Sequence, residues 1–259
     1  MNFNVQHFKL ATIFLTRLPV KVEGEVNDYE LNESSGYFAL VGLLIGLLLS
    51  LSYVALSSIF PTDISIALVL AIGLLLTGAF HEDGFADVWD GFGGGWSHED
   101  KLSIMKDSRL GTYGAAALMI LLLVKYLSLV ALTDELWPVL VALVLGHVLS
   151  RAFATSLIQK LKYVQADALS KVKPIAKKLS RDSEQLLWYS AFITVIVLWF
   201  VTPLSMWFFA GLIVLLSVIR FLCSLWFKKQ LGGYTGDCLG AAQQLNEVAV
   251  YLYFVALWQ

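Results

Sequence analysis

The chain has 259 residues, of which 58% are hydrophobic and only 15% are charged, and its mean hydropathy is +0.73. A soluble domain of this length needs more polar residues to cover its surface, so the composition excludes an ordinary soluble protein and favours one that is dissolved in lipid. The 18 basic and 20 acidic residues nearly balance, which gives no indication of nucleic acid as a partner.

The first predicted element is an amphipathic helix over residues 3–18, in an N-terminal segment that spans residues 1–20. Apolar side chains recur along it at helical spacing and form a broad stripe that Lys9 and Arg17 interrupt. The helix is expected to end at Pro19, because proline disfavours helical backbone in the residue before it. Two interpretations fit this pattern: a helix at the membrane interface, and a helix packed against the rest of the protein.

Seven apolar runs follow, each a candidate for crossing about 30 Å of hydrocarbon, which takes roughly 20 helical residues. The fifth run is short and only Thr202 and Pro203 separate it from the sixth, so these two also fit a helical hairpin that stops short of the far side. We predict an all-α, polytopic transmembrane bundle of about seven spans, with six as the alternative, in a single domain over residues 1–259. The runs cover residues 35–60, 64–80, 112–132, 136–158, 186–201, 204–227 and 239–258.

Lysine and arginine residues outside these runs fall on alternate sides of the predicted membrane. They occupy the N-terminal segment and the connections after the second, fourth and sixth spans, whereas the loops at 61–63, 133–135 and 202–203 contain none. Because basic residues are retained on the cytoplasmic side, we expect the N-terminus and these connections to face the cytoplasm.

The densest polar cluster follows the second span, in a predicted cytoplasmic active-site loop over residues 81–111. Asp83, Asp87 and Asp90 are spaced i, i+4 and i+7, which places them within a narrow arc of one helical face. Three carboxylates on one stripe repel one another unless a cation lies among them, and oxygen ligands of this kind suit Mg²⁺ or Mn²⁺. The alternative is a solvated acidic helix end, but the small and apolar neighbours of these residues are not typical of one.

A glycine run and a basic motif follow the acidic cluster. Gly93-Gly94-Gly95 precedes Lys106-Asp107-Ser108-Arg109-Leu110-Gly111, which leads into the third span. Glycines allow backbone N–H groups to approach phosphate oxygens, and arginine binds such oxygens through two parallel hydrogen bonds. Arginine at a membrane boundary is more often an orientation anchor. Beside three carboxylates on the same side, however, the motif favours a site for phosphoryl transfer.

Polar residues also mark the fourth and the last spans. Gly236 and Asp237 open the last span, where Asp237 is either a helix cap or a carboxylate that contacts a ligand. His147 and Arg151 lie one turn apart in the fourth span, and ionisable residues at membrane depth are functional candidates because burying them is costly. Arg151 also fits a side chain that extends to the membrane surface. The polar stripe that ends at Glu247 predicts that the last span lines a cavity.

These motifs together resemble the cobalamin synthase family, the adenosylcobinamide-GDP ribazoletransferases, along essentially the whole chain. No single block is specific, but their order and spacing are. The blocks are Phe14-Leu15-Thr16-Arg17-Leu18-Pro19-Val20, the segment from Phe80-His81 to Asp90-Gly91, Asp107 to Gly114, Ser150-Arg151, and Thr235-Gly236-Asp237 with Gly240-Ala241.

The resemblance implies that α-ribazole, or its 5′-phosphate, attacks the cobinamide-linked phosphate of adenosylcobinamide-GDP and that GMP leaves. On this basis we expect Asp83, Asp87, Asp90 and Asp107 to hold one or two Mg²⁺ ions on the pyrophosphate. Arg109 is expected to bind phosphate oxygens and stabilise the departing GMP. Further substrate contacts are expected at Gly111, Arg151, Gly236 and Asp237. A carboxylate among others can have a raised pKa, so one of this set is the predicted general base, Asp83 in preference to Asp237.

Other classes of membrane protein share parts of this pattern. Asp87-Val88-Trp89-Asp90-Gly91 reproduces the opening of the CDP-alcohol phosphotransferase signature, but the Ala-Arg that should follow is absent. An intramembrane prenyltransferase normally carries two aspartate-rich motifs, and this chain has one good one. A transporter would place its acidic residues near the bilayer midplane, whereas the densest ones here lie at one surface. A purely structural membrane protein has no need of three carboxylates in phase.

The expected location is the bacterial inner membrane, with membrane lipid around the bundle. The basic segment over residues 160–181 suits contact with anionic lipid or with a soluble partner from the corrinoid pathway. A homo-oligomer is equally compatible with the sequence.

Overall fold

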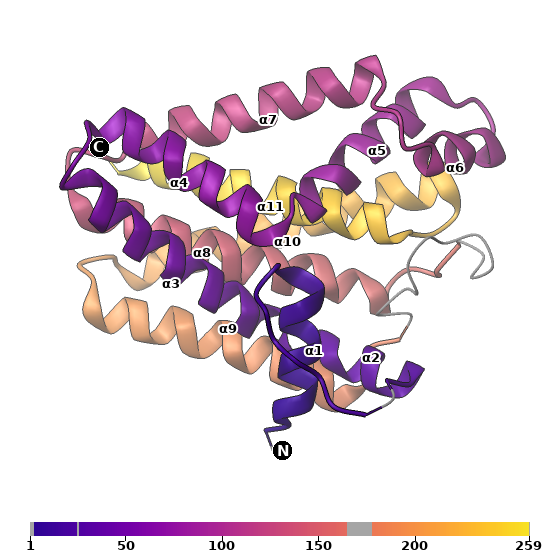
Figure 1. Cartoon of the computed structure of the whole chain (residues 1–259), viewed down its shortest axis with the longest axis horizontal. Coiled ribbons are helices and arrows are strands. Elements are labelled where there is room, and N and C mark those ends of the chain that lie inside the picture. Colours follow the sequence, from indigo (N-terminus) through magenta and orange to yellow (C-terminus); the bar gives the residue numbers. More distant parts are fainter. Residues whose placement is uncertain (1–2, 25, 165–177, 259) are drawn as a thin grey trace.

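The structure is a computed structural model that describes residues 3–24, 26–164 and 178–258. These residues form a bundle of helices, and within them the only β-type pairing is an isolated bridge between Tyr163 and Tyr234. The predicted all-α bundle is therefore confirmed. The long helices run roughly along one another, while the two N-terminal helices stand to one side of the bundle (Figure 1).

The helices follow one another in the chain as α1 (Val5–Leu15), α2 (Asp28–Ser34), η1 (Ser35–Tyr37), α3 (Phe38–Ser57), α4 (Thr62–Thr77), α5 (Phe80–Gly94), α6 (His98–Lys106), α7 (Thr112–Val130), α8 (Leu136–Thr155), η2 (Ser156–Gln159), α9 (Arg181–Val201), α10 (Met206–Leu231) and α11 (Gly236–Leu257). The predicted active-site loop over residues 81–111 is thus mostly helical, since α5 and α6 fill it. Most of the basic segment 160–181 lies outside the described residues.

Among the residues that the structure describes, five segments are long and apolar enough to cross a membrane, and the number rises to six if the bent pair of α4 and α5 counts as one span. The five contain α3, α7, α8, α9 and α10. The expected count of about seven also included α11, whose polar residues Gln243, Gln244, Asn246 and Glu247 set it apart from the apolar helices. α9 begins at Arg181, five residues earlier than its apolar run, so α9 and α10 are each long and apolar enough to cross a membrane, which favours two spans over the shortened hairpin.

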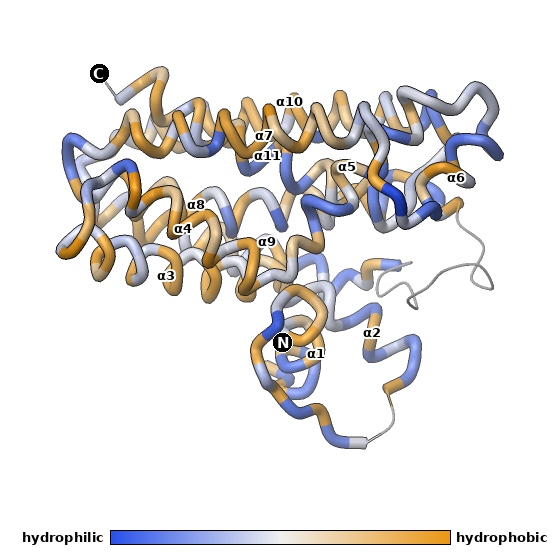
Figure 2. The backbone as a smooth tube through the Cα atoms, turned by 45° about the horizontal axis from the view of Figure 1, so that its top comes forward, coloured by the Kyte–Doolittle hydropathy of each residue, from blue (hydrophilic) through white to orange (hydrophobic). Residues whose placement is uncertain are grey.

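α8 occupies the centre of the bundle. Within its candidate span 83% of the residues are buried, against 28%, 22% and 28% for the spans of α7, α9 and α10. α8 packs mainly against α3 and α11. The outer helices carry hydrophobic side chains along their length, whereas hydrophilic residues gather around α2, α5 and α6 (Figure 2). This distribution is what lipid requires of a multi-pass membrane protein.

The predicted N-terminal helix exists as α1 and ends at Leu15, before Pro19. The helix packs on the bundle: the half-buried Phe14 ring stacks on Phe38 of α3 at 5.8 Å and meets Phe80 of α5 edge-on at 4.8 Å. Just after the helix, Arg17 donates its backbone N–H to Leu76 O at 2.7 Å. The N-terminal segment therefore braces the junction of α4 and α5.

That junction is a sharp bend. α4 and α5 meet at 88° across two residues, Gly78 and Ala79, which both have left-handed backbone (φ 67° and 53°). Glycine adopts this conformation without cost, whereas Ala79 is the one described non-glycine residue that does so. The Arg17 side chain lies against Gly78, where any Cβ would overlap its guanidinium. The bend aims α5, with its acidic residues, away from the line of α4.

Candidate active site

The acidic stripe (Asp83, Asp87 and Asp90) lies on α5, as the spacing predicted. All three residues fall within the helix Phe80–Gly94, and they differ in exposure: Asp83 is exposed, Asp87 is half-buried and Asp90 is buried. The first turn of α5 starts at Ala79, which provides no side-chain cap. The stripe therefore runs from an open helix start into the protein.

Asp237 approaches the start of the stripe because α5 and α11 pack backbone against backbone. A Cβ on Gly84 would lie 2.9 Å from Asp237 Cα, and one on Gly240 would lie 3.2 Å from His81 O. Only glycine allows helices to come this close. Burial, and after it the carboxylate of Asp83, raises the pKa of Asp237 to about 6. The structure thus brings together two carboxylates that are 154 positions apart in the sequence.

The loop before α11 is held by backbone hydrogen bonds. Tyr234 donates its N–H to Lys162 O at 2.9 Å, and its carbonyl accepts from Val164 N at 3.0 Å. Thr235 then caps α11 by accepting from Cys238 N at 3.3 Å. The helix therefore has its cap in Thr235, and Asp237 is not needed for that role. This leaves the interpretation of Asp237 as a carboxylate available to a ligand.

Asp90, unlike the exposed Asp83, binds backbone groups of another helix. Its two carboxylate oxygens accept the N–H groups of Gly111 and Gly114, each at 2.8 Å. These N–H groups open α7, where the helix dipole favours a negative charge. Asp90 therefore fixes the start of α7 against α5. The backbone N–H of Gly111, predicted to contact substrate phosphate, is used in this contact instead.

Arg109 and Asp107 form a pair on the loop between α6 and α7. Arg109 Nε donates to Asp107 Oδ1 at 3.0 Å, and the hydrogen bonds and negative charge of Asp107 raise the pKa of Arg109. The arginine side chain is 87% exposed. An oriented, exposed guanidinium suits an incoming phosphate, so Asp107 serves here to aim Arg109.

The predicted glycine positions divide into packing and open ones. A Cβ added to Gly93 would lie 2.7 Å from Cγ of the Tyr113 ring. A Cβ added to Gly95 would lie 2.7 Å from the backbone nitrogen of Lys101. These two glycines serve close packing around α5 and α6. A Cβ added to Gly236 would meet nothing within 4 Å.

The four predicted metal ligands are not assembled as one set. Across the described ranges, no three His, Cys, Asp or Glu side chains are grouped so as to hold a metal ion. Asp90 and Asp107 are engaged by the α7 N-terminus and by Arg109, whereas Asp83 and Asp87 lie one turn apart with Asp237 nearby. Mg²⁺ commonly takes one or two protein carboxylates and completes its shell with water and substrate phosphate. The donors present fit that kind of shared site.

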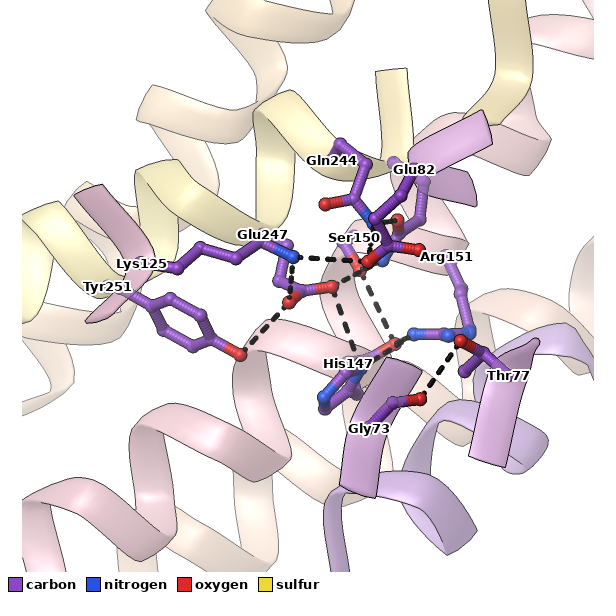
Figure 3. Close-up of polar contacts among 11 residues, drawn as sticks. Gly73, Thr77, Glu82, Lys125, His147, Ser150, Arg151, Gln244, Glu247 and Tyr251 are labelled. Carbon is purple, nitrogen blue, oxygen red and sulfur yellow. Dashed lines mark hydrogen bonds and ion pairs between the residues drawn. The ribbon is translucent and has the colours of Figure 1, made fainter. Parts of the chain in front are cut away.

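A second group of charged residues, the ionic cluster (Glu82, Lys125, His147, Arg151 and Glu247), lies inside the bundle (Figure 3). Lys125 Nζ is 2.7 Å from Glu247 Oε1 and 3.6 Å from Glu82 Oε1. Arg151 Nη1 lies 3.0 Å from His147 Nδ1, so this nitrogen of the imidazole accepts a hydrogen bond. All five residues are buried. One interpretation of the sequence had Arg151 extend to the membrane surface. Its burial within the bundle contradicts that interpretation.

Glutamine side chains complete the cluster from α11. Gln243 donates to Glu247 Oε2 at 2.7 Å and to Ser150 Oγ at 2.9 Å, while Gln244 donates to Glu82 Oε1 at 2.9 Å. Together with Leu49, Leu70, Leu74, Leu122 and Leu143, members of the cluster line a cavity. The prediction that the last span lines a cavity is thus confirmed.

Sequence reasoning missed Glu82 and Lys125 as members of this group. Lys125 stands alone within an apolar span, which is itself a signal because an unpaired buried charge is costly. Glu82 could not be told apart in the sequence from the neighbouring acidic residues of the stripe. The argument that charges lie at a single surface was also incomplete, since Lys125 lies well inside α7 and Glu247 about halfway along α11.

Comparison with known proteins gives one consistent family. The sequence model of the family described as Cobalamin-5-phosphate synthase matches residues 7–255. A protein of Vibrio cholerae serotype O1 (strain ATCC 39541 / Classical Ogawa 395 / O395) is 44% identical over 260 residues, which cover 100% of this chain and 97% of the relative. Relatives in Shewanella frigidimarina (46% over 257 residues, 96% of this chain and 94% of the relative) and Shewanella piezotolerans (47% over 247 residues, 95% and 93%) are equally similar. All three are named adenosylcobinamide-GDP ribazoletransferase. No solved structure matches this chain.

Proposed function

The chain belongs to the cobalamin-5-phosphate synthase family of enzymes, and from that premise we propose that it joins adenosylcobinamide-GDP to α-ribazole with release of GMP. A free ribose hydroxyl oxygen of α-ribazole, not the 5′-oxygen that is esterified in the 5′-phosphate, forms a bond to the cobinamide-linked phosphorus, and the bond from that phosphorus to GMP breaks. The hydroxyl proton passes to a carboxylate. The ribazole 5′-phosphate is the second acceptor we propose, since the family description specifies a 5-phosphate product.

The observation that carries this proposal is the meeting of the acidic stripe with Asp237. Asp83 and Asp237 come from α5 and α11 and lie close enough for their charges to interact. Two neighbouring carboxylates bind a cation or a proton more readily than an isolated carboxylate does. Attack of a hydroxyl on a pyrophosphate needs a group that takes the hydroxyl proton and a cation that neutralises the phosphate.

We propose that Asp83 and Asp87 hold Mg²⁺ together with the pyrophosphate of the substrate. When bound, the ion would neutralise charge on the phosphate that is being transferred. The partly exposed position of both side chains supports this, because a substrate phosphate must reach the same site. Asp90 acts as a positioning residue through α7.

The general base in this proposal is one of the pair Asp83 and Asp237. The sequence favoured Asp83, but the raised pKa of Asp237 supports the second residue, since a base with a pKa near 6 accepts a proton readily near neutrality. Arg109, aimed by Asp107, binds the phosphate of the departing GMP. Gly236 leaves room at the start of α11 for the same substrate.

We further propose that the protein lies in the bacterial inner membrane with α5, α6 and the start of α11 on the cytoplasmic side. The distribution of basic residues supports this orientation, because loops on the opposite side contain none. Adenosylcobinamide-GDP carries charged phosphates and α-ribazole carries a polar ribose, which suits a site at the aqueous surface.

The test is GMP release by purified full-length protein that is given adenosylcobinamide-GDP, Mg²⁺ and either α-ribazole or its 5′-phosphate. We expect release that needs both substrates, stops with EDTA and falls about 10²–10³-fold in Asp87→Asn. Asp134→Asn makes the same chemical change in the exposed loop between α7 and α8 and should release GMP at the wild-type rate.

Folded protein that releases no GMP with either acceptor would refute the transferase proposal. Release that persists in EDTA would refute only the role of Mg²⁺. Wild-type rates in folded Asp87→Asn protein would remove the acidic stripe from the site.

A further inference from the structure

The cavity beside the ionic cluster is small, with a volume of about 20 Å³. Residues of α3, α4, α5, α7, α8 and α11 line it, among them Gly73 and the cluster residues Glu82 and Arg151. A water molecule needs about 10–15 Å³ of such space. The cavity therefore has room for one water and excludes a larger ligand.

Three polar atoms of the residues around this cavity lack hydrogen-bond partners within the chain. Over the part of the chain that the structure describes, four buried side-chain nitrogen or oxygen atoms are unpaired, and three of them belong to residues lining this one cavity. They are Glu82 Oε2, Arg151 Nε and Gln244 Oε1 (Figure 3). Buried polar atoms are almost always paired, so three exceptions at one small cavity call for a shared partner from outside the chain.

The neighbouring hydrogen bonds determine what these three atoms offer. Gln244 Nε2 donates to Glu82 Oε1 at 2.9 Å. Because a carboxylate only accepts hydrogen bonds, the nitrogen of this amide must face Glu82, and its unpaired atom is the oxygen. Arg151 uses Nη1 on His147, which leaves its Nε–H as an unpaired donor. The cavity therefore offers one donor and two acceptors.

The charges around the cavity disfavour an ion. The carboxylates of Glu82 and Glu247 balance the cations of Lys125 and Arg151, so an added charge would have no counter-charge within the bundle. A cation would also face the Nε–H of Arg151, and an anion would face the unpaired oxygen of Glu82. The occupant is therefore neutral as well as small.

We propose that the cavity binds one structural water molecule. The water accepts a hydrogen bond from Arg151 Nε–H and donates its two hydrogens to Glu82 Oε2 and Gln244 Oε1. About three hydrogen bonds is the usual number for a buried water. This one molecule pairs all three atoms.

The water joins three helices at the start of the acidic stripe. Glu82 directly precedes Asp83 in α5, Gln244 belongs to α11 and Arg151 belongs to α8. α5 and α11 carry the two carboxylates that meet, Asp83 and Asp237, so the water ties both helices to the centre of the bundle. The site goes beyond the proposed function and does not depend on it, because the cavity is too small for a substrate.

The experiment uses Gly73→Ala, whose effect on stability changes sign with the water. Outside its own helix, a Cβ added to Gly73 would meet only Leu49, at 3.4 Å and 3.8 Å, so the methyl group fits the wall of the cavity and takes the space of the water. In a dry cavity this alanine would stabilise the protein, because glycine weakens a helix and the methyl group gains contacts. Displacing the water instead leaves three buried polar atoms unpaired.

We expect the unfolding midpoint of full-length Gly73→Ala protein in detergent to lie at least about 3 °C below that of the wild type. Gly94→Ala is the matched control, because its added Cβ would also meet a single side-chain methyl group at 3.4 Å, that of Ile104, and Gly94 lies outside the cavity. Its midpoint should not fall. A Gly73→Ala protein at least as stable as the wild type would overturn the inference, and so would an equal fall in both variants.

A second measurement observes the water itself. A density map of the wild-type protein that resolves ordered water elsewhere in the bundle should show a peak about 2.7–3.2 Å from each of Arg151 Nε, Glu82 Oε2 and Gln244 Oε1. A map of that quality without the peak would overturn the inference even if Gly73→Ala were destabilised. The proposed function would be unaffected, since GMP release tests it separately.

Discussion

The acidic stripe and the ionic cluster share α5, where Glu82 belongs to the cluster and Asp83 to the stripe, yet their charges are handled in opposite ways. In the cluster every charged group meets an opposite charge or a hydrogen-bonding side chain within the bundle. At the stripe, Asp83 is exposed and its near neighbour Asp237 is another acid. Buried charge must be balanced by the protein itself, whereas charge at an open site is left for a substrate or an ion to balance.

The largest effect expected from this difference follows removal of one charge from the cluster. Lys125→Met leaves Glu247 and Glu82 without their cation, and breaking a buried pair costs about 3–5 kcal/mol of stability. Thermal unfolding in detergent should show a strongly lowered midpoint. The double variant Lys125→Met/Glu247→Gln removes both charges and should recover most of the loss. A double variant no more stable than the single one would contradict the pairing.

A change at the stripe should affect the rate and leave stability intact. Asp83→Asn removes an exposed charge, so the unfolding midpoint should stay near that of the wild type. GMP release should fall about 10²–10³-fold, because the charge acts on the reacting phosphate. If instead Asp83→Asn unfolded like Lys125→Met, the contrast between the two regions would be wrong.

An intermediate effect is expected where Asp90 joins the stripe to α7. Gly114→Ala places a Cβ against Asp90 Oδ2 and 2.8 Å from the backbone oxygen of Ala86, which has little freedom to move. We expect a loss of about 1–3 kcal/mol, typical of an overpacked site. Gly236→Ala is the matched control for stability, since nothing lies within 4 Å of the added carbon. Equal unfolding midpoints for the two variants would argue against a tight junction.

The smallest effect is expected at Arg109, whose side chain is 87% exposed. Arg109→Lys keeps the charge but loses the planar pair of donors, so we expect KM for adenosylcobinamide-GDP to rise about tenfold with an unchanged unfolding midpoint. Steady-state GMP release over a range of substrate concentrations measures this. A fall in kcat at constant KM would instead indicate that Arg109 acts only in the transition state.

The stripe could be predicted from the sequence because it depends on local spacing. Asp83, Asp87 and Asp90 belong to one helix, and helical periodicity alone places them on one face. Their separate roles were not predictable in the same way. Asp90 caps a helix that begins more than twenty residues later, and Asp237 joins Asp83 only because Gly84 and Gly240 let two distant helices touch.

The cluster was only partly predictable for the same reason. His147 and Arg151 were recognisable from their positions in an apolar span, and Glu247 from the polar stripe of the last one. Their charged partners Glu82 and Lys125 come from two other places in the chain, and a hydropathy pattern carries no information on which buried charges meet. The start of α9 was misplaced because charged residues at Arg181 to Glu184 form its first turn and are not apolar.

The bend between α4 and α5 has a consequence for the surrounding lipid. α4 has 16 residues, which at about 1.5 Å per residue span about 24 Å. The hydrocarbon layer is about 30 Å thick, and a bilayer accommodates a helix shorter than this by thinning beside it. Such mismatch has an elastic cost that rises with acyl-chain length. The enzyme should accordingly be most stable in short-chain lipids, and the thickness of its host membrane becomes a variable that acts directly beside the helix that carries the acidic stripe.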